Sequence, residues 1–335
     1  MQTPLAARKN KTNTMPRFRP LRELGEQSCC AIVLHTPASN CGIDCTKGHR
    51  HTPDYNVGHF LKQLQVQFFD VQKRQYPIVM FHEDLLATQK RILRSKTLSP
   101  VMFFKLNLNP MALPMHLRPK FAAIVNATKE VHRNGDLFRT EKVGATFRGF
   151  QQRMLSRFYA GEMLMEHKSL RGYKYILRFD ATDVRISAPF SYDPFERAQM
   201  LKSIYSYHTT TVEPETTIIN PILSGWLENM EFSGKLIKPF VNKESDSFVY
   251  NGRAYSRSVE LFKLSSFKTP TYKSMFEATD KAGAFLLSET FDKSLTDGQF
   301  LGIAIPFVAS SSPQAVTELS DFPIQYHVDL DESYM

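Results

Sequence analysis

The sequence has little cysteine and no long hydrophobic run. Four of its 335 residues are cysteine, and all four lie between Cys29 and Cys45. This number and spacing exclude the disulfide framework of a small secreted domain. No apolar stretch reaches the roughly 18 residues of a membrane-spanning helix, and the N-terminus lacks the apolar core of a signal peptide. The sequence therefore predicts a chain that is soluble as given and has no transmembrane segment.

Acidic residues are missing from the start of the chain, and basic residues from its end. Residues 1–22 contain six basic side chains and no acid, which accounts for +6 of the formal net charge of +9. This segment could contact nucleic acid or an anionic membrane surface, serve as an organelle presequence, or remain a solvated tail. It lacks the interleaved aromatic series of a single-strand-binding surface, so we expect no nucleic-acid partner. We predict a basic flexible segment at 1–28 and an acidic C-terminal segment at 311–335.

Cysteine and histidine gather in the stretch CGIDCTKGHRH, which offers Cys41, Cys45, His49 and His51 at short spacing. All four are zinc-competent side chains, but C-x3-C followed by H-x-H is not the spacing of a usual zinc finger. A structural metal, a disulfide and plain loop cysteines all stay open for this stretch.

Apolar strands alternate with amphipathic helices from residue 29 onward. Strand-like runs occupy Cys30–Thr36 and Tyr76–Asp84, and each is followed by a segment with apolar residues at helical spacing, at 56–75 and 85–95. Residues 96–145 are rich in proline and methionine and predict an irregular excursion. No repeat or long linker follows, so we predict one α/β domain at 29–310 with a nucleotide-binding, mostly parallel mixed sheet flanked by helices.

Two aspartates, Asp180 and Asp183, stand at the end of an apolar, aromatic-rich run that begins at Tyr173. In open α/β sheets the ligand sits outside the carboxyl ends of the strands. A divalent cation that bridges two phosphates needs hard oxygen ligands at that place, and it offsets the charge that develops on a departing diphosphate. A helix cap or a turn is the plainer interpretation of such a pair.

The residues around this acidic pair add a further signal. The stretch YKYILRFDATDVRISAPFSYDPF, residues 173–195, resembles the signature of glycosyltransferase family fifteen, the fungal Golgi α-1,2-mannosyltransferases, in which Y-x-W-R-V-E-P-x-V precedes D-Y-D-P-F. Further blocks resemble the family in the same order: YPIVMFHEDL (76–85), RMLSRFYAG (153–161), EPETTIINPILSGW (213–226) and residues 250–285, which follow Y-N-x-C-H-F-W-S-N-F-E-I and Y-x-x-Y-F-E-Y-L-D-x-A-G-G-F.

This resemblance implies a GT-A-type fold and roles for particular acids. The metal-binding glutamate of the family falls on Asp180, and Asp183 offers a second ligand. The candidate nucleophile or general base falls on Glu260. A late metal-binding histidine is replaced, by count, by Asp297, and either Asp297 or His327 could take its place, or metal binding is weakened. An oxygen ligand at this position suits Mn2+ or Mg2+.

The activity implied is retaining transfer of a hexose, with GDP-mannose as the expected donor and a glycan or glycoprotein as the acceptor. Arg178, Arg153 and Arg157 are candidates to orient phosphates, with surface salt bridges as the alternative. Tyr173 and Tyr192 could line the sugar or base pocket, or belong to the core.

Two other functions stay open. One is a transferase with a different sugar nucleotide, and the other is a non-catalytic carbohydrate- or nucleotide-binding module on the same fold. We expect a cytoplasmic location, or the Golgi lumen if an anchor has been lost or truncated.

Overall fold

The computed structural model describes residues 29–36, 53–108, 113–119, 151–182, 184–213, 219–244, 247–286 and 294–326. The predicted basic segment at 1–28, the Cys41–His51 group, Asp183 and His327 lie outside the described residues. Within the described ranges, no helix has the length and apolar character needed to cross a membrane.

A seven-stranded sheet forms the centre of the molecule, in the order β12-β6-β11-β4-β1-β2-β3. Its strands are β1 (Cys30–Thr36), β2 (Ile78–His82), β3 (Val101–Lys105), β4 (Tyr175–Phe179), β6 (Tyr205–Tyr207), β11 (Val259–Lys263) and β12 (Val316–Glu318). β11 runs antiparallel to both of its neighbours, β4 and β6. The other pairs are parallel. This arrangement confirms the predicted mostly parallel mixed sheet.

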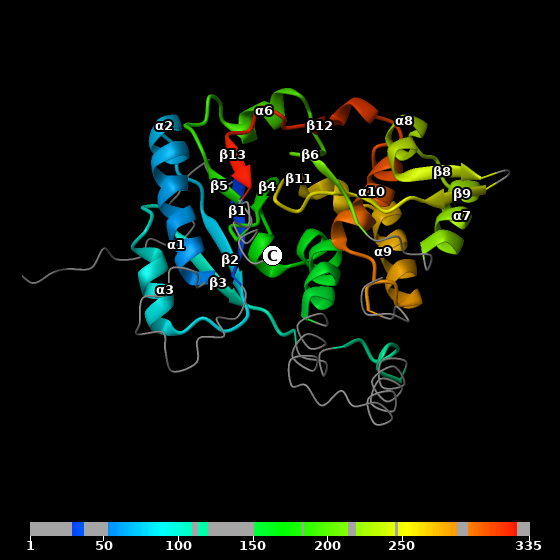
Figure 1. Cartoon of the computed structure of the whole chain (residues 1–335), viewed down its shortest axis with the longest axis horizontal. Coiled ribbons are helices and arrows are strands. Elements are labelled where there is room, and N and C mark those ends of the chain that lie inside the picture. Colours follow the sequence, from blue (N-terminus) through cyan, green and yellow to red (C-terminus); the bar gives the residue numbers. More distant parts are fainter. Residues whose placement is uncertain are drawn as a thin grey trace, which may run out of the picture.

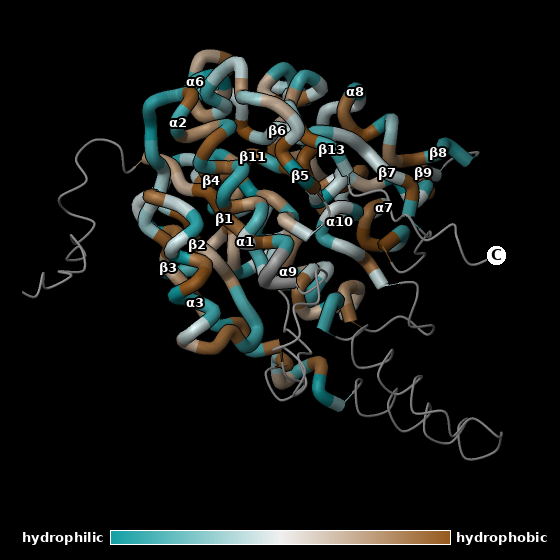
Figure 2. Tube along the Cα trace, turned by 60° about the vertical axis from the view of Figure 1, so that its left-hand side comes forward, coloured by the Kyte–Doolittle hydropathy of each residue, from teal (hydrophilic) through white to brown (hydrophobic). Residues whose placement is uncertain are grey.

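Helices cover both faces of this sheet because its central strands are apolar on both faces. Ile32 and Leu34 of β1 pack in one hydrophobic cluster with α1 (Pro53–Leu64) and α3 (Ala87–Arg94). Ala31 and Val33 belong to a second cluster on the other face, with the π-helix η5 (Tyr159–Met163), α9 (Pro270–Ala282) and α10 (Asp297–Val308). Figure 1 shows these two helical layers on opposite sides of the strands, and in Figure 2 hydrophobic residues concentrate in the strands. A side chain on β4 or β11 therefore faces one layer or the other according to whether its number is odd or even.

Three small two-stranded sheets complete the fold. They pair β5 (Val184–Ile186) with β13 (Ile324–Tyr326), β7 (Thr210–Val212) with β10 (Arg253–Tyr255), and β8 (Val241–Glu244) with β9 (Ser247–Tyr250). The remaining α-helices in the described ranges are α2 (Asp70–Gln72), α6 (Pro194–Met200), α7 (Asn220–Asn229) and α8 (Gly234–Ile237).

The C-terminal part of the described chain belongs to the domain rather than to a separate acidic segment. β12 is an edge strand of the main sheet, and β13 pairs with β5. Asp321, between these strands, accepts hydrogen bonds from Arg197 and Tyr192. The predicted boundary at residue 310 therefore falls too early, because strand pairing and these contacts hold 316–326 against the domain.

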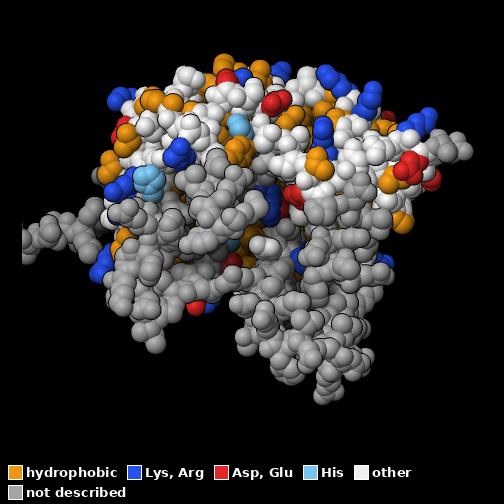
Figure 3. All heavy atoms as spheres, in the orientation of Figure 1, with side chains coloured by type: hydrophobic (Ala, Val, Ile, Leu, Met, Phe, Trp, Pro, Cys, Tyr) orange, Lys and Arg blue, Asp and Glu red, His pale blue; other side chains and the backbone are white. Residues whose placement is uncertain are grey.

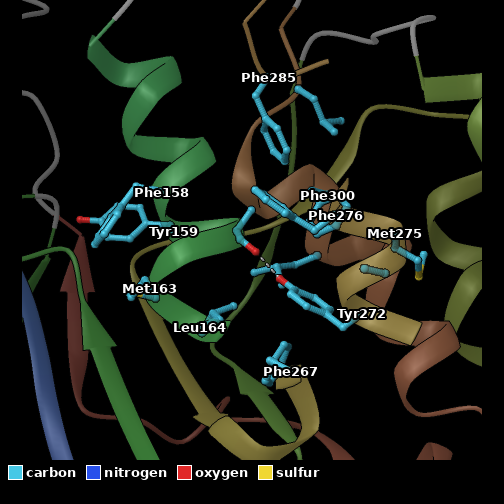
Figure 4. Close-up of a cluster of buried hydrophobic side chains, with 14 of the residues drawn as sticks. Phe158, Tyr159, Met163, Leu164, Phe267, Tyr272, Met275, Phe276, Phe285 and Phe300 are labelled. Carbon is cyan, nitrogen blue, oxygen red and sulfur yellow. Dashed lines mark hydrogen bonds between the residues drawn. The ribbon is translucent and has the colours of Figure 1, made fainter. Parts of the chain in front are cut away.

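The core on the α9 and α10 side fixes the position of η5 (Figure 4). The hydroxyl of Tyr272 on α9 donates a hydrogen bond of 2.7 Å to the carbonyl oxygen of Ala160. Gly161 of η5 lies so close to the ring of Phe276 that a Cβ at this position would collide with the ring. Figure 4 shows Tyr159 on the other side of η5 from Phe276. A π-helical turn, which is rare and often found at functional sites, thus holds Tyr159 in a defined place.

Candidate active site

The topology brings the ends of three strands to one edge of the sheet. β1 and β4 are parallel, so His35 near the end of β1 and Asp180 directly after β4 come to the same edge. β11 runs the other way, so its first residues, and Arg257 just before it, arrive there too. The backbone N–H of Asp180 donates to the carbonyl oxygen of Ser258 at 3.0 Å, which fixes this approach. This edge is where ligands bind in open α/β sheets.

Asp180 is half-buried at this edge and holds a tight turn. Its Oδ1 accepts hydrogen bonds from the backbone N–H of Thr182 at 3.1 Å and from the Thr182 hydroxyl at 2.6 Å. One oxygen of Asp180 therefore stabilises a turn, as the plainer interpretation of the acidic pair predicted. The other oxygen, Oδ2, accepts no hydrogen bond from the described part of the chain, so it is available to a ligand.

A buried ion cluster lies beside Asp180 on the same face of the sheet. Arg178 stands directly opposite Glu260 in the antiparallel pair of β4 and β11, and its Nη2 donates to Glu260 Oε2. Its Nη1 lies 2.9 Å from Oδ2 of Asp297. The guanidinium also lies 4.4 Å above the centre of the Tyr159 ring, a cation–π contact. The hydroxyl of Tyr205 donates to Glu260 Oε1 at 2.6 Å.

The charges in this cluster depend on one another because water does not reach them. Glu260 and Asp297 are 0% exposed. Burial raises the pKa of the Glu260 carboxyl, and Arg178 offsets this only in part. Burial by itself would lower the pKa of Arg178, but Glu260 and Asp297 outweigh it and raise that pKa. Removing Arg178 would leave two buried carboxylates without their common cation.

The same contacts change the role predicted for Glu260. A nucleophile or general base needs a carboxylate oxygen that can reach the substrate. Both oxygens of Glu260 are engaged, one by Tyr205 and the other by Arg178, and the residue is fully buried. This geometry suits a positioning residue that fixes Arg178 better than a group that contacts the anomeric carbon.

Asp297 begins α10, which follows the N-cap Thr296. Its Oδ1 lies 3.6 Å from Nη1 of Arg257 and its Oδ2 lies 2.9 Å from Arg178. A metal ligand presents its carboxylate to a cation together with other oxygens, whereas both oxygens here face guanidinium groups. No group of three His, Cys, Asp or Glu side chains in the described ranges could hold a metal ion. Asp297 therefore does not fit the predicted metal role, and we derive no reaction step through a metal.

Replacing Gly298 with alanine should destabilise the protein by about 1–3 kcal/mol, the usual cost of forcing extra atoms into a packed site. A Cβ on Gly298 would collide with the backbone carbonyl oxygen of Tyr255, which cannot rotate away. Chemical denaturation measures this loss. Gly225→Ala in α7 is the matched control, because a Cβ there meets no atom within 4 Å and alanine favours a helix by up to about 1 kcal/mol. Equal stability of the Gly298→Ala variant and the wild type would contradict this packing.

Four other predicted site residues are not part of the cluster. Arg157 forms a bidentate salt bridge with Asp280 of α9, at 2.6 and 2.8 Å, and Arg153 donates to the carbonyl oxygen of Leu286 at 3.2 Å. These arginines connect the helical layer to α9 and the segment after it. They do not orient a ligand at the Asp180 edge.

The two tyrosines are also placed elsewhere. Tyr192 packs against the hydrophobic cluster on the opposite face of the sheet and donates to Asp321 at 2.8 Å. Tyr173 is buried just before β4, at the end of the strand away from Asp180. Burial raises its pKa, as expected of a core phenol. The core interpretation is therefore right for Tyr173, and neither tyrosine lines the Asp180 edge.

Several residues of the edge were not predicted from the sequence. They are His35, Tyr159, Tyr205, Glu213 and Arg257. Burial lowers the pKa of His35 to about 4, so its ring is neutral near neutral pH. Glu213 accepts a hydrogen bond of 2.7 Å from Thr296, and burial raises its pKa. Of these five residues, only Arg257 could have been found from the sequence, because it stands three residues before Glu260 and just before a strand. Figure 3 shows basic and acidic side chains next to each other near the middle of one face.

Known proteins resemble this chain in both sequence and fold. The family model described as glycolipid 2-alpha-mannosyltransferase matches residues 49–295. O-glycoside alpha-1,2-mannosyltransferase homolog 2 of Schizosaccharomyces pombe is 23% identical over 222 residues, which cover 64% of this chain and 55% of that protein. The match thus spans little more than half the length of this curated relative.

Solved structures agree on the architecture. Core-mannan synthase A of Aspergillus fumigatus, in its Mn/GDP form, has a TM-score of 0.63 at 16% identity and covers 88% of this chain and 75% of its own. Mannosyltransferase Ktr4p of S. cerevisiae in complex with GDP has a TM-score of 0.61 at 14% identity, covering 90% and 72%. At these identities the likeness concerns the fold alone, and it confirms the predicted GT-A-type fold.

Proposed function

Because the chain belongs to the glycolipid 2-alpha-mannosyltransferase family, we propose that it transfers a mannosyl group from GDP-mannose to a hydroxyl group of a glycan or glycoprotein. Transfer proceeds with retention of the anomeric configuration. The observation that carries this proposal is the edge of the sheet at which Asp180, with one unused oxygen, adjoins the buried pair of Arg178 and Glu260. The matched family region contains all three residues.

The chemistry of the edge supports a sugar nucleotide. A departing diphosphate develops negative charge, and preorganised cations in a dry site stabilise it. Arg178 has the required charge but is 4% exposed at its side chain and held by two carboxylates. It therefore acts by fixing the strands and the start of α10, while Asp180, which is more exposed, contacts the donor.

We propose Asp180 and Asp183 as the residues that would hold a divalent ion. Core-mannan synthase A was solved with Mn and GDP, which supports testing Mn2+ with this chain. We leave Asp297 out of the proposed site, because its two oxygens face the guanidinium groups of Arg178 and Arg257. The transfer assay, the nucleotide screen and the calorimetry below are therefore each performed with and without the metal.

The test is a transfer assay with radiolabelled GDP-mannose and free mannose or α-methyl mannoside as the acceptor. It is run with Mn2+, with Mg2+ and with EDTA. The expected product is an α-linked disaccharide, whose anomeric configuration is read from its NMR coupling constants. A β-linked product would contradict retention, and absence of any transfer or donor hydrolysis would contradict the enzymatic proposal.

Two further outcomes separate the alternative functions. Turnover of a UDP-sugar in place of GDP-mannose would identify a transferase with a different donor. Binding of a nucleotide with no turnover of any sugar nucleotide would identify a non-catalytic module on the same fold. A thermal-shift screen of GDP, UDP and other nucleotides, with and without Mn2+, measures nucleotide binding independently of turnover. A ligand that binds the folded state raises the melting midpoint.

A further inference from the structure

Among the described residues at this edge of the sheet, Arg257 carries a positive charge that a ligand can reach. It lies just before β11, and the carbonyl oxygen of the next residue, Ser258, accepts a hydrogen bond from the backbone N–H of Asp180. Its side chain is 38% exposed, whereas that of Arg178 is 4% exposed. Asp297, Glu213 and Asp180 all raise its pKa above the ordinary arginine value, so its guanidinium is charged near neutral pH.

The guanidinium of Arg257 has hydrogen-bonding capacity that the described residues do not use. An arginine carries five N–H donors in a planar fork. The ion pair with Asp297 is 3.6 Å long, beyond hydrogen-bond distance, and Arg257 makes no side-chain hydrogen bond within the described ranges. Arg178 holds the same carboxylate at 2.9 Å, so Asp297 keeps one guanidinium partner when Arg257 turns toward a ligand.

We propose that Arg257 binds the diphosphate of the donor directly, without a metal ion between them. This inference rests on the proposed function and adds a residue to it. The guanidinium fork matches two phosphate oxygens, which makes arginine the preferred side chain for bidentate phosphate recognition.

The experiment compares guanosine, GMP and GDP, which share the base and differ in phosphate number. Isothermal titration calorimetry is performed on the full chain in Mn2+ and in EDTA. Arg257→Gln keeps much of the side-chain length and removes the charge, and Arg257→Lys keeps the charge and removes the fork. Arg253→Gln is the matched control, since Arg253 is an exposed arginine on the neighbouring strand β10.

We expect Arg257→Gln to weaken GDP binding by about tenfold or more, as loss of a charge-assisted hydrogen bond does, in both buffers. Guanosine affinity should stay within about twofold, and Arg257→Lys should lie between the glutamine variant and the wild type. Arg253→Gln should bind all three ligands as the wild type does. This pattern assigns the phosphate contact to Arg257, because a general loss of structure would weaken guanosine as well.

Other results would overturn the inference. If Arg257→Gln binds GDP with wild-type affinity, Arg257 does not contact the diphosphate. If the variant loses equal affinity for guanosine and GDP, Arg257 has a structural role instead. A wild-type protein that binds GDP in Mn2+ but not in EDTA would show that a metal holds the diphosphate. None of these three results would contradict mannosyl transfer itself. Failure of the wild type to bind GDP in either buffer would instead reject the proposed donor, and the inference with it.

Discussion

Replacing Arg178 with methionine should lower the free energy of unfolding by about 3–5 kcal/mol, the typical cost of removing one partner from a buried ion pair. Methionine fills a similar volume, so the loss comes from charge rather than from a cavity. Two carboxylates, on Glu260 and Asp297, would be left at 0% exposure without their common cation. Urea denaturation followed by circular dichroism measures the change. Arg253→Met, at an exposed arginine, should alter stability by no more than about 0.5 kcal/mol.

The pH dependence of this variant identifies the cause. Burial already raises the pKa of Glu260, and Arg178 is the main group that lowers it. Without Arg178, this pKa rises further above its ordinary value of 4.5. A carboxyl whose pKa is raised in the folded state binds protons there more readily than in the unfolded chain, so the folded state gains stability as the pH falls. The deficit of the variant should therefore shrink between about pH 7.5 and pH 5.

A triple variant provides the matching test. Arg178→Met combined with Glu260→Gln and Asp297→Asn removes the cation and both anions together. It should recover part of the lost stability, because neither buried carboxylate is then left charged without Arg178. A deficit in Arg178→Met that is independent of pH, or that the triple variant fails to reduce, would show that the charges are not the reason for the loss.

Local patterns in the sequence predict the strands and the acidic edge. Cys30–Thr36 and the run that ends at Phe179 are apolar on both faces, as parallel strands covered by helices must be, and both are strands in the structure. Asp180 follows directly and lies at the carboxyl edge, as predicted. The short run FLGIAIPFV is apolar throughout, and such a run does not distinguish a buried strand from a buried helix. It forms most of α10, with Pro306 inside the helix.

The contacts of the site could not be predicted because they join distant parts of the chain. Arg178 and Glu260 meet through the register of β4 and β11, and no local pattern specifies which residues of two strands stand opposite each other. Arg157 likewise matched a family block, but its partner is Asp280. A resemblance indicates that such residues matter. Only the fold shows whether each one contacts a ligand or another element.

The motif SYDPF illustrates the same difference. It matched the family pattern beside the acidic pair, which suggested that Tyr192 lines the pocket. In the structure Asp193 is the N-cap of α6, and its side chain accepts hydrogen bonds from the backbone N–H groups of Phe195 and Glu196. Pro194 occupies the first helical position, where its missing N–H costs nothing. The motif therefore forms the start of a helix in this chain.

Asp180→Asn should reduce mannosyl transfer by about 100-fold or more while leaving the fold intact. Asparagine keeps Oδ1, which accepts both hydrogen bonds from Thr182, so the turn after β4 is preserved. The variant removes the negative charge and replaces Oδ2, which accepts no hydrogen bond from the described residues, by an NH2 group that can only donate. We expect kcat/KM with GDP-mannose to fall and the melting temperature to stay within about 2 °C, because both hydrogen bonds from Thr182 are kept.

Asp84→Asn is the matched control for Asp180→Asn. Asp84 follows β2 in the sequence, as Asp180 follows β4, but its side chain is 74% exposed and pairs with Lys105. Removing its charge should leave transfer within about twofold of the wild type, because an exposed ion pair contributes little. If Asp180→Asn transfers mannose at the wild-type rate, the oxygen at the end of β4 contacts neither the donor nor its counterion, and the reaction centre lies elsewhere. If the two variants lose activity equally, the loss reflects the overall charge of the protein, since only Asp180 adjoins Arg178, Glu260 and Arg257 at the edge of the sheet.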